Sequence, residues 1–457
     1  DVEEDHIVPS DLIKYIMRAS VDMIWNGGIG TFVKASFEAN SDAGDRGNDS
    51  LRINADELKA KVFCEGGNLG LTQAARIEFA KNGGSINTDF IDNSAGVDCS
   101  DHEVNLKVML NRVVDEGGMT VSQRNQLLKK MTNHVAVLVL QNNYQQNRLI
   151  SMALQFSGYY MSLYVSFMRH YQASGDIDRG LECLPDDSEL NKRMKSGASL
   201  YRPEISVLVS HAKIILEKKL RKMEMLDSEF YQPYALQYFP LAISKGYKEH
   251  ILSHRLYREI LSTRLSNMVV TDMGVAYVFQ MEQELSISVD KIVNAYLVAR
   301  EIFSLDELHS EIQSHDHLVD ARIQHEMSET VSRLIRRSTR WLLHYDSELQ
   351  NPEAVISKFK PFMTSLYKKV GQYLLGEDKQ NYEDSRERYI AASVSERCAT
   401  KIALLPSLYH GLIIIDASSI VKNDVATMAR VYFKIIRHFQ LIWLRDVINS
   451  HEVLNRW

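Results

Sequence analysis

Two small polar loops between residues 61 and 100 carry the residue types that could hold a nucleotide. The first loop, Glu-Gly-Gly-Asn at 65–68, follows the apolar run 62–64, and the second, Asp-Asn-Ser-Ala-Gly at 92–96, follows a run through Phe90 and Ile91. Ligands of open α/β sheets bind beyond the carboxyl ends of the strands, so we expect both loops to face one crevice. The pattern therefore predicts nucleotide binding.

The elements around these loops suggest how the loops are positioned. Residues 62–64 and 90–91 are typical of short buried strands, and Leu71 to Lys81 has the spacing of an amphipathic helix that the glycines at 83 and 84 end. Glycines cluster up to about residue 105, whereas later segments show long windows of helical apolar spacing. One such helix should begin at Thr120, where Gln123 completes a capping box.

This change from glycine-rich segments to long helical patterns predicts two domains. Residues 1–110 should form an α/β domain, the C-terminal half of a Rossmann-like dinucleotide-binding fold, and residues 111–457 a long all-α region. The expected half-domain lacks the G-x-G-x-x-G loop that follows the first strand of a complete fold, since Gly28-Ile29-Gly30 has no third glycine. We therefore expect the chain to begin inside a fold.

Composition excludes several classes of protein. The chain has 457 residues, is 45% hydrophobic and 25% charged, and carries a net charge of −6 from 53 basic and 59 acidic residues. This balance disfavours nucleic-acid and membrane-surface partners. No apolar run approaches the ~18 residues of a membrane span and no signal peptide is evident, so we expect a cytoplasmic protein.

Cysteines and histidines do not indicate a metal site. The four cysteines are far apart in sequence, which favours reduced thiols. His315 and His317 are two residues apart and so do not share a helix face, and no third ligand accompanies them. We predict no metal.

Three segments closely resemble the large bacterial NAD-dependent glutamate dehydrogenases. The match lies in WNGGIGTFVKAS (25–36), EGGNLGLTQAARIEFAKNGG (65–84) and NTDFIDNSAGVDCSDHEVNLK (87–107), and continues in RPEISVLVSHAKIIL (202–216). The resemblance covers nearly the whole chain and places it in the C-terminal part of a much longer enzyme. It implies NAD as cofactor and oxidative deamination of L-glutamate to 2-oxoglutarate and ammonia.

The resemblance also implies roles for individual residues near the cofactor. Asn68, after Gly66 and Gly67, matches an asparagine that contacts the cofactor near the nicotinamide ribose. Gly67 departs from the family's usual alanine, and we expect that change to matter little. Asn93 matches the residue that holds the nicotinamide carboxamide, for which an amide supplies both donor and acceptor.

On the substrate side, Ser100 matches a serine that binds the side-chain carboxylate of glutamate, and Val97 should line the same pocket. A hydroxyl can donate to a carboxylate without burying a further charge. Asn26, Gly27 and Gly28 align with the end of the preceding strand and are the remaining cofactor candidates.

The family's catalytic lysine and aspartate lie in an upstream substrate domain that has no counterpart here. We therefore expect the catalytic residues upstream of this chain, in the N-terminal remainder of the same enzyme, and no turnover of glutamate by the 457 residues alone. The alternative is a noncatalytic helical scaffold, with a degenerate nucleotide fold, that serves assembly or regulation. Long helices with more than one apolar face also predict a homo-oligomer.

Overall fold

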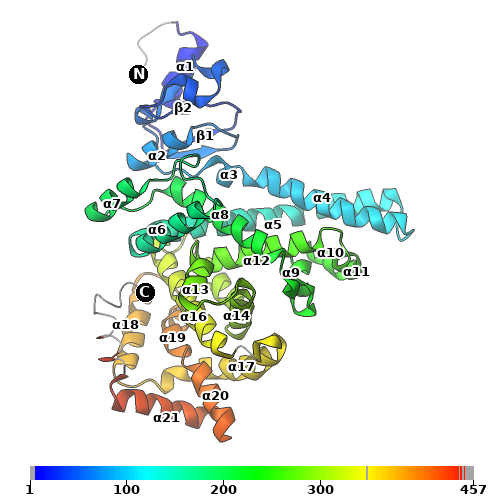
Figure 1. The fold of residues 1–457 in the computed structure, drawn as a ribbon, viewed down its shortest axis with the longest axis vertical. Coiled ribbons are helices and arrows are strands. Elements are labelled where there is room, and N and C mark those ends of the chain that lie inside the picture. The colour runs from blue at the N-terminus through cyan, green and yellow to red at the C-terminus, as the bar shows by residue number, and fades with distance from the viewer. Residues whose placement is uncertain (1–5, 346–347, 442, 445–446, 448–457) are drawn as a thin grey trace. The chain divides into compact units, whose positions relative to one another are not determined.

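The computed structural model describes residues 6–345, 348–441, 443, 444 and 447. The chain divides into two compact units, Asp1–Gln280 and Met281–Trp457 (Figure 1). We refer to them as unit 1 and unit 2. The domain boundary that we expected at residue 110 stays a prediction.

Unit 1 begins with short strands and continues in helices. Its elements are α1 (Pro9–Met17), β1 (Met23–Asn26), β2 (Val33–Lys34), β3 (Ile53–Asn54), β4 (Val62–Glu65), α2 (Gln73–Lys81), α3 (Asp89–Asp92), α4 (Ser94–Asp115), α5 (Val121–Gln155), α6 (Ser157–Ala173), α7 (Asp187–Ser196), α8 (Arg202–Leu220), α9 (Gln232–Leu236), α10 (Leu241–Gly246), α11 (Lys248–Leu252) and α12 (Tyr257–Met273).

The strands form two small parallel pairs. β1 pairs with β4, with Asn26 opposite Glu65, and β2 pairs with β3. A single parallel bridge joins Val62 to Ser85 on the other side of β4. Within each pair the strands are parallel, so their carboxyl ends lie at the same edge.

The expected fold class is wrong. The structure is 71% helical with only 3% strand, so it is mostly all-α and does not contain an α/β half of a Rossmann-like fold. The apolar runs before residue 110 are too short for a larger sheet, because strands of two to four residues bury little surface. Glycine-rich loops and short 3₁₀ turns occupy much of the sequence that we expected to be sheet.

The run at Phe90-Ile91 is helical rather than a strand. It forms α3, and the single residue Asn93 separates α3 from α4. Asp89 and Asp92 both accept hydrogen bonds from backbone N–H groups of the first loop. Residues three apart share one face of a helix but lie on opposite faces of a strand, so only the helical conformation brings both carboxylates to the loop.

Local signals were more reliable than the sheet prediction. The strand at 62–64 and the helix at 71–81 are confirmed as β4 and α2, and Thr72 caps α2 by accepting from Ala75 N. The capping box at the start of α5 is also confirmed, since Thr120 Oγ1 accepts from Gln123 N at 3.2 Å and Gln123 Oε1 accepts from Thr120 N at 2.8 Å.

Among the described residues, two apolar clusters pack around the strands and around α4. One lies around the strands and includes Val33, Ile53, Phe63 and Leu71, all 2% exposed or less. The other joins α4, α5 and the segment from Tyr238 to Ile260. α4 and α5 run side by side (Figure 1). The first cluster therefore supports the loops, and the second supports the helix that follows them.

Unit 2 is built from packed helices. α13 (Tyr277–Leu285) spans the division between the units, and the following elements are α14 (Val289–Ile302), α15 (Leu305–Gln313), α16 (Ala321–Leu342), α17 (Pro352–Tyr367), α18 (Glu377–Ala391), α19 (Glu396–Leu408), α20 (Gly411–Val421) and α21 (Val425–His438). α14 packs on α16 and α17, α18 on α19, and α20 on α21.

Within the described part of the chain, no single helix is long and apolar enough to span a membrane. Among the same residues, the pair α19 and α20, bent by 56° where they meet, reaches that length and composition together.

Candidate functional site

The loops after β1 and β4 leave the same edge of their sheet. The backbone N–H groups of Gly66 and Gly67 both donate to the carbonyl oxygen of Asn26, at 2.8 and 3.2 Å. Because Asn26 and Glu65 are paired at the ends of β1 and β4, the loops that follow these strands leave the sheet side by side. The structure thus brings the predicted residues of the first and second segments together.

Glycine is required where these loops touch. A Cβ atom on Gly67 would lie 2.4 Å from the carbonyl oxygen of Gly28, and one on Gly66 would lie 2.5 Å from the ring of Trp25. Backbone therefore packs directly on backbone at Gly67. We expected the glycine at 67 to be a minor departure from alanine, but in this structure an alanine would require one loop to move.

Asn93 joins the third segment to these loops. Its side-chain Nδ2 donates to the carbonyl oxygen of Gly67 at 3.1 Å and to Asn68 Oδ1 at 2.5 Å. The two asparagines proposed from the sequence are therefore adjacent. Among the described residues, Asn93 Oδ1 and Asn68 Nδ2 have no hydrogen-bond partner, which leaves an acceptor next to a donor.

A buried ion pair fixes the base of the first loop. Glu65 is fully buried, and its carboxylate accepts from Arg76 Nε at 2.7 Å and Arg76 Nη2 at 2.9 Å. The same carboxylate accepts from the backbone N–H of Leu71 at 3.0 Å, so it bonds both ends of the loop. Burial raises the pKa of Glu65, and the bonds from Arg76 oppose that shift.

Two further carboxylates fasten the loop from the α3 side. Asp89 accepts from Leu69 N at 2.8 Å, and Asp92 accepts from Glu65 N at 3.1 Å. Burial raises the pKa of Asp92. Sequence reasoning missed the roles of Arg76, Asp89 and Asp92. An available signal was Arg76 itself, a charged residue beside the apolar positions of a helix, which needs a buried partner.

The substrate-side candidates lie on α4. Val97 and Ser100 follow Asn93 by four and seven residues, so the three positions share one face over about 10 Å of helix. Val97 is 74% exposed and Ser100 is also exposed. The face that continues from Asn93 is thus open to a ligand or to another protein surface.

Asn26 is a candidate with a buried amide nitrogen that bonds to no described residue. Its Oδ1 accepts weakly from Gly28 N at 3.4 Å, while Nδ2 is buried and has no hydrogen-bond partner among the described residues. Gly27 and Gly28 are exposed beside it. A buried amide without a partner costs free energy, so this donor weakens the packing beneath the loops.

A polar cluster anchors α4 behind the exposed face. His102 is 2% exposed and stacks on Tyr238 with the ring centroids 4.3 Å apart. Asp98 Oδ1 lies 3.6 Å from His102 Nε2, and Tyr238 donates its hydroxyl to Asp101 Oδ2 at 2.6 Å. Burial lowers the pKa of His102, although both aspartates act in the opposite direction.

Within the residues that the structure describes, no group of three His, Cys, Asp or Glu side chains is placed to hold a metal ion. His315, which we considered in the sequence, is buried: Nε2 accepts from Ser395 N at 3.0 Å, and Nδ1 lies 2.9 Å from the carbonyl oxygen of Glu311. It serves as a structural contact between two helices.

Two family models match the chain. Residues 1–153 match "Bacterial NAD-glutamate dehydrogenase, catalytic domain", and residues 197–457 match "Glutamate dehydrogenase, C-terminal". The two matches cover different parts of the chain. The first contains the surface formed by residues 26–28, 65–68 and 92–96, which we call the loop face, and the second contains the helices from α8 onward.

Curated relatives match along the whole chain. The NAD-specific glutamate dehydrogenase of Pseudomonas aeruginosa is 40% identical over 457 residues, that of Halomonas elongata 37% over 456, and that of Mycobacterium tuberculosis 34% over 451. These alignments cover 99–100% of this chain but 28% of each relative. The chain therefore spans a little over a quarter of the length of these proteins.

Proposed function

Since this chain belongs to the family of bacterial NAD-dependent glutamate dehydrogenases, we propose that it forms part of an enzyme that oxidatively deaminates L-glutamate to 2-oxoglutarate and ammonia. The observation that carries the proposal is the meeting of three distant loops at Asn26, Asn68 and Asn93. Residues matched by the catalytic-domain model include all three.

The loop face has the hydrogen-bonding groups that the nicotinamide end of NAD requires. Asn93 Oδ1 and Asn68 Nδ2 offer an acceptor beside a donor, which complements the amide of a carboxamide. Asn26, Gly27, Gly28, Gly66 and Gly67 supply backbone and amide groups around them. NAD, when bound, accepts the hydride. The protein's part here is to hold and orient the ring.

The substrate end of the site is proposed on α4. Ser100 can donate its hydroxyl to the side-chain carboxylate of glutamate, and Val97 can pack against the aliphatic part of the substrate. Both side chains lie on the face that begins at Asn93. Binding of glutamate on this face of α4 would place the substrate next to the nicotinamide.

Apolar side chains around the loops support a covering partner. Trp25 is 60% exposed, Ile29 86% and Leu69 61%. Large apolar groups gathered around a polar site are typical of a surface that another part of the protein covers. We propose that the N-terminal remainder of the same enzyme covers it and supplies the lysine and aspartate that handle the protons of amine oxidation.

The proposal is tested by measuring glutamate-dependent formation of NADH by the intact protein and by the 457 residues alone. We expect turnover by the intact protein and none by the 457 residues, together with binding of NAD by the intact protein in a calorimetric titration. Absence of both NAD binding and turnover in the intact protein would refute the proposed function.

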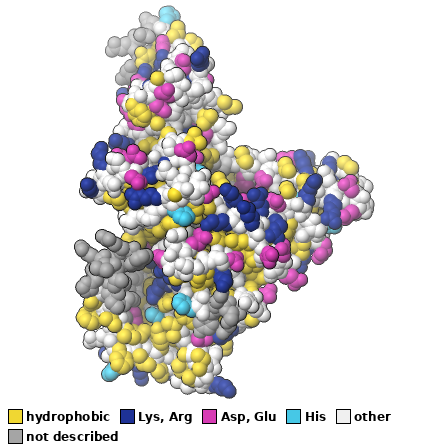
Figure 2. All heavy atoms as spheres, in the orientation of Figure 1, with side chains coloured by type: hydrophobic (Ala, Val, Ile, Leu, Met, Phe, Trp, Pro, Cys, Tyr) yellow, Lys and Arg dark blue, Asp and Glu magenta, His cyan; other side chains and the backbone are white. Residues whose placement is uncertain are grey.

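We also propose a homo-oligomer. Apolar side chains are exposed over the part of unit 2 that holds α20 and α21 (Figure 2). On α21, Val431 is 43% and Ile435 46% exposed, one turn apart. Light scattering of the intact protein tests this directly: charged substitutions at these two positions should lower the subunit number. A cytoplasmic location stays a prediction from composition.

A further inference from the structure

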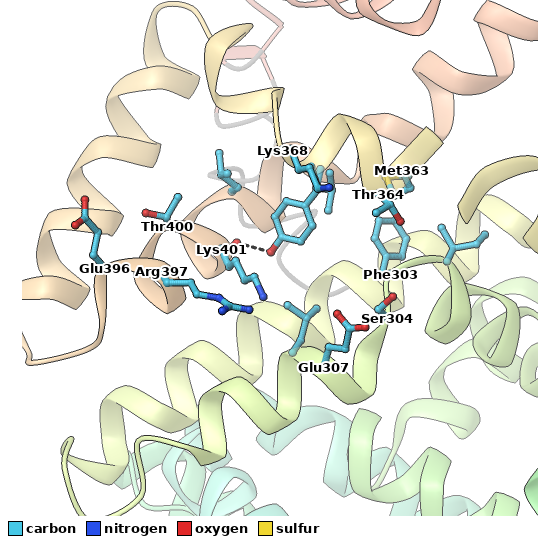
Figure 3. A pocket seen from close by; sticks show the side chains of 15 residues that line it. Phe303, Ser304, Glu307, Met363, Thr364, Lys368, Glu396, Arg397, Thr400 and Lys401 are labelled. Atoms are coloured by element: carbon cyan, nitrogen blue, oxygen red, sulfur yellow. Dashed lines mark hydrogen bonds between the residues drawn. The ribbon is translucent and has the colours of Figure 1, made fainter. Parts of the chain in front are cut away.

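Unit 2 contains a cavity that the proposed dehydrogenase site does not use. It has a volume of about 840 Å³ and lies between the end of α14, the start of α15, and α17 and α19 (Figure 3). All its lining residues fall between Ile302 and Leu408. The volume is within the range of sites for small organic molecules.

The inner wall of the cavity is apolar and fixed by packing. Its apolar members are exposed by 6% or less in the structure: Ile302, Phe303, Leu308, Met363, Leu404 and Leu408. Tyr367 completes the wall, and its hydroxyl donates to the carbonyl oxygen of Lys401 at 2.8 Å. A ligand would therefore meet a preformed apolar surface, which favours an apolar body.

The mouth of the cavity is charged. Glu311 forms ion pairs with two cations: one carboxylate oxygen lies 3.2 Å from Arg397 Nε, and the other pairs with Lys401. The side chain of Arg397 is nevertheless 79% exposed, and no contact of its terminal nitrogens is found among the described residues. Arg397 can therefore donate to a ligand while Glu311 holds it in place.

A hydroxyl group and a carboxylate lie across the mouth from these cations. Figure 3 shows Ser304 and Glu307 on the side facing Arg397 and Lys401. Within the described residues, the side chains of Glu307 and Lys368 have no hydrogen-bond or ion-pair partner. Ser304 has a left-handed backbone (φ 51°, ψ 54°), a conformation that is strained in a non-glycine residue and that clusters at ligand sites.

The cavity opens into a polar groove of about 660 Å³ that shares Glu307, Arg397 and Lys401 with it. An apolar chamber with charged groups at its opening is complementary to an amphipathic molecule. Glu396 is paired with Arg386, and Glu311 neutralises Lys401. The remaining charged groups are Arg397, Lys368 and Glu307, which leave one positive charge in excess.

We propose that this cavity binds a small molecule with a carboxylate attached to an apolar body. The carboxylate binds Arg397, with Lys368 as the second cation of the lining, and the body packs against Met363 and Leu404. This chemistry is shared by medium-chain fatty acids and by amino acids with apolar side chains. In an amino acid, the ammonium group would bind Glu307. The site is separate from the proposed dehydrogenase function and does not depend on it.

Calorimetric titrations of the intact protein with octanoate and with L-leucine test the proposal. Two variants disrupt the site: Arg397→Gln removes the cation, and Thr364→Trp fills the cavity from an exposed position on α17. Arg322→Gln is the matched control, because the Arg322 side chain is 80% exposed and lies outside the cavity. Thermal melting of each variant checks that it folds.

We expect saturable binding of at least one of the two molecules, weakened by about tenfold or more in Arg397→Gln and in Thr364→Trp and unchanged in Arg322→Gln. Weaker leucine binding in Glu307→Gln would identify an amino acid as the ligand, whereas binding of octanoate alone would identify a fatty acid. Failure of both molecules to bind at millimolar concentrations, or equal binding by all folded variants, would overturn the proposal.

Discussion

The loop face of unit 1 and the cavity of unit 2 use charged side chains in opposite ways. Under the loops, Glu65 is fully buried and Arg76 is 4% exposed, and their bonds hold the backbone that forms the site. At the cavity, the Arg397 side chain is 79% exposed and is placed to contact the proposed ligand directly. The charged side chains of the first site thus stabilise its backbone without lining it, whereas Arg397 lines the second site.

This difference predicts which changes affect folding and which affect binding. A buried charge that loses its partner is strongly destabilising, whereas an exposed ion pair contributes little. Substitutions beneath the loops should therefore lower stability, while substitutions at the cavity mouth should alter affinity and leave the fold intact.

The largest effect should come from Arg76→Met. Without Arg76, the carboxylate of Glu65 is buried without a cation, which typically costs about 3–5 kcal/mol. Urea unfolding measures this loss, and Arg397→Gln should change the unfolding free energy by less than about 0.5 kcal/mol. Adding Glu65→Gln to Arg76→Met should restore part of the stability. Equal stabilities of the Arg76 and Arg397 variants would break the comparison.

Gly67→Ala should have the next largest effect. Its Cβ would lie 2.4 Å from the carbonyl oxygen of Gly28, so a loop must shift, at a cost of about 1–3 kcal/mol. Thermal unfolding of Gly67→Ala and Gly96→Ala tests the point, because a Cβ on Gly96 meets nothing within 4 Å. If the two variants melt alike, close backbone packing does not shape the loop face.

Asn93→Ala should affect activity more than stability. It removes the bonds to Gly67 and Asn68 and one proposed ligand of the carboxamide, so we expect kcat/KM for NAD to fall about tenfold in the intact enzyme. Asn82→Ala, an exposed asparagine at the end of α2, is the control. Unchanged kinetics in Asn93→Ala would remove this residue from the site.

The smallest expected effect is a dependence of the unfolding free energy on pH, through His102 in unit 1. Burial holds the pKa of His102 below the ordinary value of 6.5, so the native state binds fewer protons there than the unfolded state. The stability contribution is complete above pH ~6.5 and declines as the pH falls below it. Asp98, Asp101, Tyr238 and Arg264 surround the ring and bear on the same titration.

Urea unfolding at a series of pH values should show this decline in the native protein and a flatter profile in His102→Phe. The aromatic substitution keeps a ring against Tyr238 while removing the titrating group. An identical pH profile in the variant would show that His102 does not contribute.

Sequence patterns predicted local elements better than their assembly. The strand at β4, helix α2 and its end, and the capping box at Thr120 depend on residues within one or two turns of each other, and each is confirmed. The strand proposed at Phe90-Ile91 depended on two apolar residues, too few to distinguish a strand from a helix. The α/β fold class was wrong because it rested on such short apolar runs.

The candidate site shows the same division. The asparagines and glycines of the three loops could be proposed from their residue types and the family resemblance. Their supports, Arg76, Asp89 and Asp92, could not, since each bonds a loop residue between 11 and 27 positions away, through contacts that exist only after folding. Gly67 was misjudged because the carbonyl it touches, that of Gly28, lies in a different loop.

By itself the sequence determined the family, the local helix starts and stops, and the residue types that we propose to hold NAD, because these depend on short-range patterns. Tertiary structure decided that α3 and α4 are helices at the loop face, that a buried ion pair fastens the first loop, and that unit 2 encloses a cavity with a charged mouth. Each of these depends on side chains that meet across long stretches of chain, where burial changes the free energy of every charge and every close backbone contact.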